Sequence, residues 1–270
     1  MGDRRGYEIG VMRRIGDFLF GGALAIGLAG AAEAQIVNVQ PLVAKVDREG
    51  VSGEVDASAD WRSGNTDLLL LSGSATGRYR SGPHLIFALA RGEYGRADGD
   101  RFASSHLEHL RYRAEVVEPL ELEAFAQHDR DEFRRLSLRV VGGAGPRLHF
   151  VRWAPMDAAF GAAYLLEYEE LDLDGEEADA GQTQLNHRLS LYLRVAIRFN
   201  DWLGLGYTLY AQPRFDEFED VRVLSETELL ISAKKYLSFK LSISGAADTD
   251  PPEGVEAVDV RRKASIQVSF

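Results

Sequence analysis

Residues 51–62 read VSGEVDASADWR, a stretch in which apolar or small residues alternate strictly with polar ones. Val51, Val55 and Trp61 fall on one side of an extended chain, and Glu54 and Asp56 fall on the other. Successive side chains of a β-strand point to opposite faces, so a period of two indicates a strand with two chemically different faces. The stretch predicts a strand that separates an apolar medium from a polar one.

The same alternation returns along the rest of the chain, and no segment after Gln35 has the periodicity of a long amphipathic helix. Most of the alternating segments have nine residues or more, which is long enough to cross a bilayer at barrel tilt. Strands of soluble proteins average roughly five to six residues. The predicted strands are 51–61, 67–80, 85–95, 103–116, 120–128, 136–146, 156–168, 184–196, 202–212, 222–232, 237–247 and 258–270.

The connections between these strands alternate in length. We expect longer extracellular loops at 62–66, 95–101, 129–135, 169–182, 213–221 and 248–257. We expect shorter periplasmic turns at 81–84, 117–119, 197–201 and 233–236, with 147–155 as a longer exception. Long outer loops and short periplasmic turns are typical of bacterial outer-membrane barrels.

Aromatic residues gather near the strand ends, where their rings would meet lipid headgroups. They include Trp61, Tyr79, Tyr94, Tyr112, Tyr168, Trp202 and Phe270. Every backbone polar group must be paired in hydrocarbon, and a closed barrel is the β structure that achieves this. We therefore predict an all-β fold: a closed antiparallel up-and-down transmembrane β-barrel of about 12 strands over residues 51–270. Alternation alone would also fit a soluble barrel that turns its apolar face inward.

The first 34 residues have the layout of a cleaved signal peptide. Arg13 and Arg14 precede an apolar run over 18–30, and Ala32-Glu33-Ala34 matches a cleavage site. Met12 is the expected true start, and residues 35–50 form a short lead-in to the first strand. No cysteine follows the cleavage site to carry a lipid anchor. These features predict export and localisation in the outer membrane of a Gram-negative envelope.

The chain has 31 basic and 42 acidic residues and a formal net charge of −11. Nucleic acid is excluded as a partner because phosphate binding needs a basic footprint. Without cysteine the chain has no disulfide framework. The expected partners are outer-membrane lipids, lipopolysaccharide and, during insertion, the barrel-assembly machinery.

The last strand ends with Ile266, Val268 and Phe270 on its apolar face. An alternating strand that ends in a free-terminal phenylalanine resembles the signal read by the barrel-assembly machinery. We therefore interpret these three residues as an assembly signal. The alternative is that Phe270 is one more lipid-facing aromatic residue, and the two readings are compatible.

Several motifs are similar to those of a known family. They are Trp61-Arg62-Ser63-Gly64-Asn65-Thr66, Arg91-Gly92-Glu93-Tyr94-Gly95, Gln212-Pro213-Arg214-Phe215-Asp216-Glu217-Phe218, Asp248-Thr249-Asp250-Pro251-Pro252-Glu253-Gly254-Val255 and Ile266-Gln267-Val268-Ser269-Phe270. Together they resemble the YdiY-like family, which is described as salt-induced outer-membrane proteins and as a domain of unknown function. The chain departs from the family at Ser63 and at Ala246-Ala247. The resemblance implies an outer-membrane barrel and no established activity.

The polar strand faces predict a lumen lined by charges of both signs. The candidate lumen residues are Glu54, Asp56, Arg78, Arg91, Glu93, Arg111, Arg113, Glu121, Glu123, Arg139, Arg188 and Arg194. Such charges can cross-link a barrel shut or line a narrow pore. Twelve strands lie between filled eight-stranded barrels and open sixteen-stranded porins, so both remain possible. We expect no plug domain, because only about sixteen residues separate Gln35 from the first strand.

The histidines do not predict an enzyme, a cofactor site or a metal site. His106 and His109 fall on opposite faces of one strand, as do His187 and Ser190. A nucleophile and its base must converge on one face. The acidic loop 169–179 could hold Ca²⁺ or Mg²⁺, but a solvated, self-repelling loop is the favoured interpretation.

The sequence thus favours an integral outer-membrane barrel, either a structural or envelope-stress protein or a narrow passive pore. The alternatives are an outer-membrane lipid-modifying enzyme and a soluble periplasmic barrel that binds an apolar ligand.

The assembly signal gives a first testable prediction. Deleting Phe270 or making Phe270→Asp should lower the amount of folded protein in the outer-membrane fraction, because the terminal strand loses its apolar end. Heat-dependent mobility in gel electrophoresis measures the folded fraction. Normal assembly of both variants would refute the signal role.

Overall fold

The computed structural model describes residues 36–43, 49–64, 67–172, 177–234 and 237–268. It contains twelve strands, one four-residue helix, α2 (Gln40–Val43), and one 3-10 turn, η1 (Glu132–Arg134). The strands are β1 (Gly50–Arg62), β2 (Leu68–Ser81), β3 (His84–Ala97), β4 (Asp100–Val117), β5 (Leu120–Asp131), β6 (Leu136–Trp153), β7 (Met156–Leu171), β8 (Thr183–Arg198), β9 (Leu203–Pro213), β10 (Val221–Lys234), β11 (Leu237–Asp248) and β12 (Val258–Val268).

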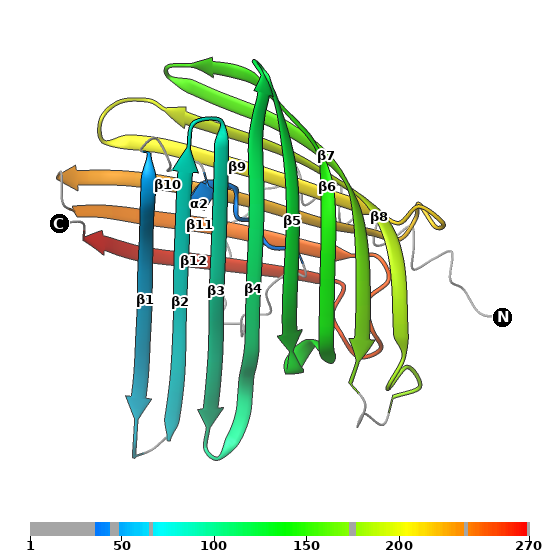
Figure 1. Ribbon diagram of the computed structural model, residues 1–270. Coiled ribbons are helices and arrows are strands. Elements are labelled where there is room, and N and C mark those ends of the chain that lie inside the picture. The colour runs from blue at the N-terminus through cyan, green and yellow to red at the C-terminus, as the bar shows by residue number, and fades with distance from the viewer. Residues whose placement is uncertain (1–35, 44–48, 65–66, 173–176, 235–236, 269–270) are drawn as a thin grey trace.

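All twelve strands belong to one sheet, and each pairs antiparallel with its neighbour in chain order. The sheet curls so that β9–β12 pass behind β1–β5 and cross them steeply (Figure 1). Such crossing of opposite walls follows from the strand tilt that closes a sheet into a barrel. The prediction of an all-β, up-and-down barrel of about twelve strands is confirmed. The described residues include no helix that is long and apolar enough to span a membrane.

The seam between the first and last strands differs from the other contacts. Within the described ranges no backbone ladder joins β12 to β1. Val51, Val55 and Trp61 on β1 are all more than 80% exposed. Pairing of the last strand with strand 51–61 therefore stays a prediction.

Several connections are shorter than the sequence indicates. The expected loop 95–101 is a two-residue turn at Asp98-Gly99, and both residues have positive φ. This dipeptide and these angles are those of a tight hairpin turn, in which glycine tolerates left-handed backbone.

The long turn expected at 147–155 is wrong, because β6 continues to Trp153 and turns at Ala154-Pro155. Gly145-Pro146-Arg147 has turn-like composition, but Pro146 lies within β6 opposite Leu122. The acidic loop is also shorter than expected, since Glu169 and Glu170 belong to β7.

The two faces of the sheet have opposite chemistry. Large apolar side chains are exposed on the outer face, among them Leu71, Ile86, Leu110, Tyr112, Leu122, Val140, Leu148, Phe160, Tyr164, Leu166, Leu241 and Ile243. The inner face buries mainly charged and polar side chains. A soluble protein rarely exposes so much contiguous apolar surface. This inside-out distribution is the one required of a barrel that is surrounded by lipid.

Residues 36–43 of the lead-in lie inside the barrel, between its walls (Figure 1). Val37 and Val39 pack against inward-facing Leu85, Phe87, Leu89 and Leu107 of β3 and β4. Ile36 packs against Tyr192, Tyr210 and Leu224 of β8–β10. The sequence leaves undecided whether the lumen is open or occluded, and here a few residues of extended chain, without a separate domain among the described residues, contact both walls.

Close approach of β6 and β7 makes a second testable prediction. A Cβ on Gly145 would lie 2.0 Å from the Ala162 carbonyl oxygen, whereas a Cβ on Gly142 would meet nothing within 4 Å. Gly145→Ala should therefore destabilise the barrel by about 1–3 kcal/mol, the usual cost of overpacking. Urea unfolding of the refolded protein measures this cost. The matched control Gly142→Ala should unfold near the wild-type midpoint, and equal midpoints for both variants would contradict the close approach.

Candidate functional site

The most buried charge in the lumen is the carboxylate of Glu167 on β7, which is 0% exposed. Three arginines from three other strands donate to it. Arg139 Nε lies 2.9 Å from Oε2, Arg188 Nε lies 3.1 Å from Oε1, and Arg222 Nη1 lies 2.8 Å from both oxygens. Burying a carboxylate costs several kcal/mol unless it is paired and hydrogen-bonded. Here three guanidinium groups on β6, β8 and β10 meet that requirement.

The ion pairs continue outward from Glu167 towards the long loops. Arg222 also donates to Glu169 through Nη2 (2.9 Å) and to Asp248 on β11 through Nε (3.0 Å). Arg188 makes a two-pronged pair with Asp220, with both N–O distances at 2.9 Å. Paired parallel bonds of this kind are the strongest arginine–carboxylate geometry. We call the set Asp129, Arg139, Glu167, Glu169, Arg188, Arg214, Asp220, Arg222 and Asp248 the upper network.

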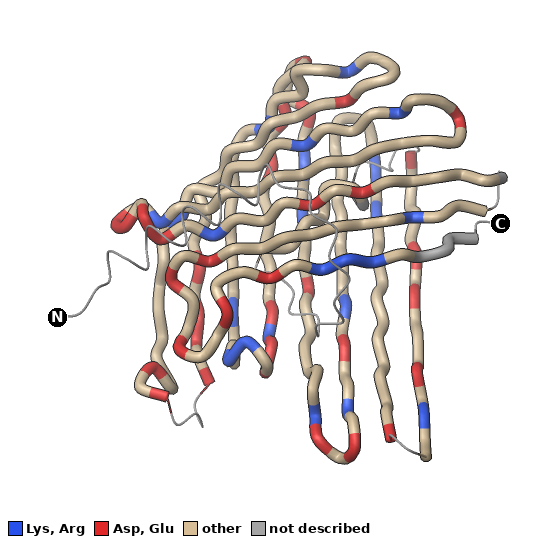
Figure 2. Tube along the Cα trace, turned by 180° about the vertical axis from the view of Figure 1, so that it is seen from behind, with Lys and Arg blue, Asp and Glu red and all other residues tan. Residues whose placement is uncertain are grey.

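A second network lies nearer the short turns. Glu123 on β5 accepts from Arg111 (3.2 Å), Arg113 (2.8 Å) and the Tyr192 hydroxyl (2.7 Å). Its neighbour Glu121 accepts from Arg147 and from Arg152. We call the set Arg111, Arg113, Glu121, Glu123, Arg147, His149, Arg152 and Asp157 the lower network. Basic and acidic residues thus mark the strand walls as well as the loops (Figure 2).

Polar contacts join the lead-in to these walls. Arg113 Nη2 donates to Gln40 Oε1 (3.3 Å), and Asn38 Nδ2 donates to Glu226 Oε2 (3.1 Å). At the barrel rim the Glu49 carboxylate accepts from the backbone N–H of Gly82 in the β2–β3 turn. The lead-in is therefore held by apolar packing, by hydrogen bonds within the lumen and by an anchor at the rim.

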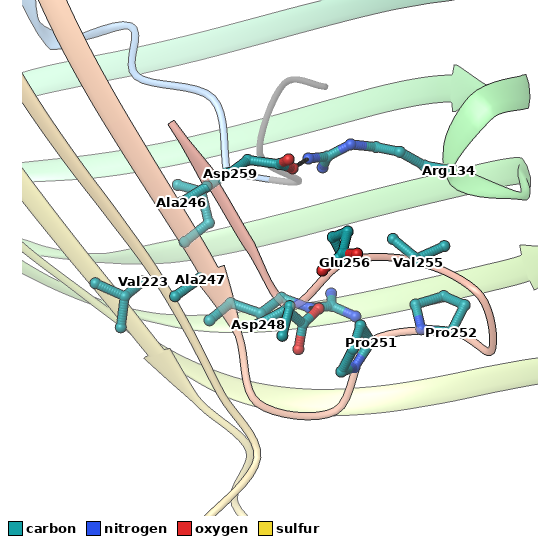
Figure 3. A pocket seen from close by; sticks show the side chains of 13 residues that line it. Arg134, Val223, Ala246, Ala247, Asp248, Pro251, Pro252, Val255, Glu256 and Asp259 are labelled. Carbon is teal, nitrogen blue, oxygen red and sulfur yellow. Dashed lines mark hydrogen bonds and ion pairs between the residues drawn. The ribbon is translucent and has the colours of Figure 1, made fainter. Parts of the chain in front are cut away.

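At the other end of the barrel, hydrogen bonds and ion pairs connect the long loops to one another. Arg135 Nη1 donates to Asp179 Oδ1 (2.6 Å) and to the carbonyl of Glu253 (2.9 Å), and the Glu253 N–H donates to Asp179. Burial raises the pKa of Asp179, but the Glu253 N–H and the Arg135 guanidinium outweigh it, so that this pKa is lowered overall. Beside these loops Arg134 pairs with Asp259 on β12 (2.6 Å) at a small pocket (Figure 3).

The short-turn end is more open. A vestibule of about 1290 Å³ enters the barrel there. Arg113, Arg147 and Arg194 line it, together with Glu121 and Glu228. Pro41 of the lead-in also lines this vestibule, so the lead-in stands at its inner end. A large free space thus lies at the short-turn end of the barrel, next to Pro41.

The candidate lumen residues have different fates in the structure. Buried inside are Arg78, Arg111, Arg113, Glu121, Glu123, Arg139, Arg188 and Arg194. Arg91 and Glu93 are half-buried, and Glu54 and Asp56 on β1 are exposed. The latter two lie on the first strand, beside the seam without a described ladder.

Several network residues lie outside the predicted lumen set. Arg147 and Glu169 fall in predicted connections although both lie in strands, and Arg222 and Glu167 are not among the candidate lumen residues. The period-two pattern of each strand, extended by a few residues, places Arg147 and Glu169 on the inner face.

The structure describes the predicted assembly signal and the acidic loop only in part. Ile266 and Val268 lie in β12, whereas Phe270 lies outside the described residues, as do residues 173–176 of the acidic loop. The described part of that loop is held by Arg135, which pairs with Glu177 and Asp179. His187 contacts the hydroxyl of Tyr164 on the outer face.

Comparison with known proteins gives a family match. The model of a family described as "Protein of unknown function, DUF481" matches residues 55–270, which confirms the resemblance found in the sequence motifs. No curated protein matches the chain in sequence.

Among solved structures the chain is similar to the NanC porin, with 8% identity, a TM-score of 0.47, and coverage of 82% of this chain and 98% of that one. It is also similar to the translocator domain of the autotransporter NalP from Neisseria meningitidis, with 13% identity, a TM-score of 0.41, and coverage of 85% and 93%.

The upper network yields a third prediction. Glu167→Gln should destabilise the barrel by about 3–5 kcal/mol, because it leaves three buried arginines without their shared partner. Glu115→Gln removes the carboxylate from the more exposed Arg80 pair (3.0 Å) and should cost less than about 1 kcal/mol. Urea unfolding midpoints compare the two variants. Similar midpoints would mean that Glu167 does not hold the lumen together.

Proposed function

The chain belongs to the DUF481 family of proteins of unknown function. We propose that this member is a structural outer-membrane barrel whose interior is occluded, rather than a constitutively open pore. The observation that carries the proposal is the combination of a buried lead-in with two ion-pair networks.

The first support is the chemistry of the lumen walls. The charges of a water-filled channel remain solvated, whereas Arg139, Glu167 and Arg188 are each at most 1% exposed. Because these charged groups are paired with one another, they are not available to interact with an ion passing through the lumen. Opening a path through the upper network would separate several buried ion pairs at once, and breaking even one such pair costs about 3–5 kcal/mol.

The second support is the position of the lead-in. Val37 and Val39 meet an apolar patch on the inner face of β3 and β4, an arrangement that would be unfavourable on a water-filled wall. With the expected cleavage after Ala34, this lumenal segment begins the mature chain. Its packing favours a filled interior over a narrow passive pore.

The apolar outer surface favours a barrel in a membrane over a soluble barrel. Apolar side chains such as Leu110, Phe160 and Ile243 point outward and are exposed, while the inner face is polar. A soluble carrier of apolar ligands would need the opposite arrangement. The proposal includes no catalytic step, and a lipid-modifying activity would be recognised by altered lipid masses after incubation with the refolded protein.

Conductance in planar bilayers tests the proposal and is the fourth prediction. The refolded chain from residue 35 onward should give no discrete current steps under an applied voltage, because the lead-in and the networks block the lumen. Discrete steps from this chain would overturn the proposal in favour of a pore.

Variants in the lead-in sharpen the test. Val37→Asp combined with Val39→Asp should release the segment from β3 and β4 and raise the conductance, because two carboxylates cannot remain buried there unpaired. Asn38→Ala is the matched control, since it removes one hydrogen bond and leaves the apolar contacts intact. Equal conductance of all the variants would show that the lead-in contributes nothing to occlusion.

A further inference from the structure

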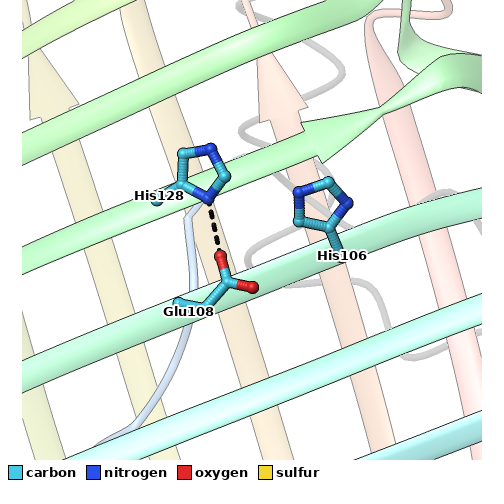
Figure 4. Close-up of side chains that lie close together, drawn as sticks. All are labelled: His106, Glu108 and His128. Carbon is cyan, nitrogen blue, oxygen red and sulfur yellow. Dashed lines mark hydrogen bonds and ion pairs between the residues drawn. The ribbon is translucent and has the colours of Figure 1, made fainter.

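Three polar side chains meet on the outer face of the barrel, away from the lumen and its networks. They are His106 and Glu108 on β4 and His128 on β5 (Figure 4). His106 and Glu108 are two residues apart and therefore share a strand face. Glu108 lies directly opposite His128 in the β4–β5 ladder. The register of two strands thus brings together residues that are twenty positions apart in the sequence.

The geometry of the three side chains is compact. His128 Nδ1 lies 2.6 Å from Glu108 Oε2, and the rings of His106 and His128 are 5.4 Å apart. One ligand atom from each residue can be chosen so that all three lie within 4.8 Å of one another. In a tetrahedral zinc centre with bonds of about 2.0–2.1 Å, ligand atoms are separated by about 3.3 Å. Small side-chain rotations would close the remaining gap without moving the strands.

Most other large side chains on the outer face of the barrel are apolar, in contrast to this cluster. On the outer face β4 continues from Glu108 with the exposed Leu110 and Tyr112, whereas β5 continues from His128 with Ala126 and Leu122 on one side and with the exposed Arg130 on the other. Polar and ionisable side chains facing lipid are costly, so those that occur usually have a functional partner. β5 ends at Asp131, three residues beyond His128. The cluster therefore lies beside the long-loop rim, where ions from the surrounding water have access.

His106 is the member that a simple hydrogen bond does not explain. Glu108 and His128 satisfy each other, whereas the ring of His106 makes no hydrogen bond within the described part of the chain and lies tilted by 40° against the ring of His128. Opposite His106 on β3 stands Gly92, which has no side chain, and opposite it on β5 stands the exposed Arg130. The imidazole of His106 thus offers a nitrogen ligand that makes no hydrogen bond among the described residues.

Other outward-facing histidines have a different setting. His84 contacts the hydroxyl of Tyr112, and His187 contacts the hydroxyl of Tyr164. Neither belongs to a group of three potential ligands within the described residues. The association of two imidazoles with one carboxylate distinguishes the His106 cluster from these histidine–tyrosine pairs.

We propose that His106, Glu108 and His128 form a binding site for a divalent transition-metal ion, with Zn²⁺ as the best-matched class. Two imidazole nitrogens and one carboxylate oxygen are a usual ligand set for Zn²⁺, and hard ions such as Ca²⁺ prefer a shell of oxygens. Three protein ligands leave one position of a tetrahedral zinc centre open for water or another ligand. The site is independent of whether the lumen conducts.

Metal titration of the refolded barrel in detergent tests this site and is the fifth prediction. Isothermal calorimetry with Zn²⁺ should detect one site per chain that survives in the presence of millimolar Ca²⁺. Replacement of Zn²⁺ by Co²⁺ should produce visible d–d absorption typical of nitrogen and oxygen ligands. His106→Ala and His128→Ala should each weaken Zn²⁺ binding by at least about tenfold, since each removes one of three protein ligands.

His187→Ala is the matched control, because it removes an exposed outward-facing histidine on β8 that has a tyrosine partner. It should leave the affinity unchanged, and heat-dependent gel mobility should verify that every variant is folded. Wild-type affinity in His106→Ala and His128→Ala would overturn the proposal. An equal loss in His187→Ala would also overturn it, because binding would then be a property of surface histidines in general.

Discussion

The carboxylate of Glu167 imposes a condition on the lumen around it. A buried carboxylate needs partners, and those that the described residues provide are guanidinium groups on β6, β8 and β10. These arginines then need acceptors of their own, which Glu169, Asp220 and Asp248 provide. Satisfying one buried charge therefore fixes the relative positions of strands far apart in the sheet. The charged side chains on these lumen walls are therefore paired with one another.

An apolar patch on the inner face explains why the apolar lead-in can lie inside a mostly polar barrel. The inner face is not uniformly charged, because Leu85, Phe87 and Leu89 on β3 point inward. On a water-filled wall these side chains would be unfavourable, but against Val37 and Val39 they form a small apolar core. Each buried aliphatic side chain of this kind contributes about 1.5–3 kcal/mol. Apolar packing on one wall and ion pairing on the others thus act together inside the barrel.

The outer face is under a different constraint. Apolar side chains are favourable in contact with lipid, and polar side chains are unfavourable there except near the rim. The group of His106, Glu108 and His128 stands at that boundary, and it combines ligands from neighbouring strands. The interior and the exterior of this barrel thus carry distinct chemistry on the two sides of the same strands. β4 contributes Arg111 and Arg113 to the lumen and His106 and Glu108 to the outer face.

The amino-acid sequence alone determined the fold class, because period-two alternation depends only on which residues are adjacent in the chain. VSGEVDASADWR and its later counterparts predicted the strands, their antiparallel order and the inward position of residues such as Arg111, Arg139 and Arg188. Strand ends were less accurate, as at Arg147 and Glu169, because turn-like composition and acidic runs resemble loops. Which charges pair, where the lead-in rests, and that His128 faces Glu108 were decided only by the tertiary structure. Those contacts depend on strand register and on the curl of the sheet, which bring together residues that local sequence patterns do not connect.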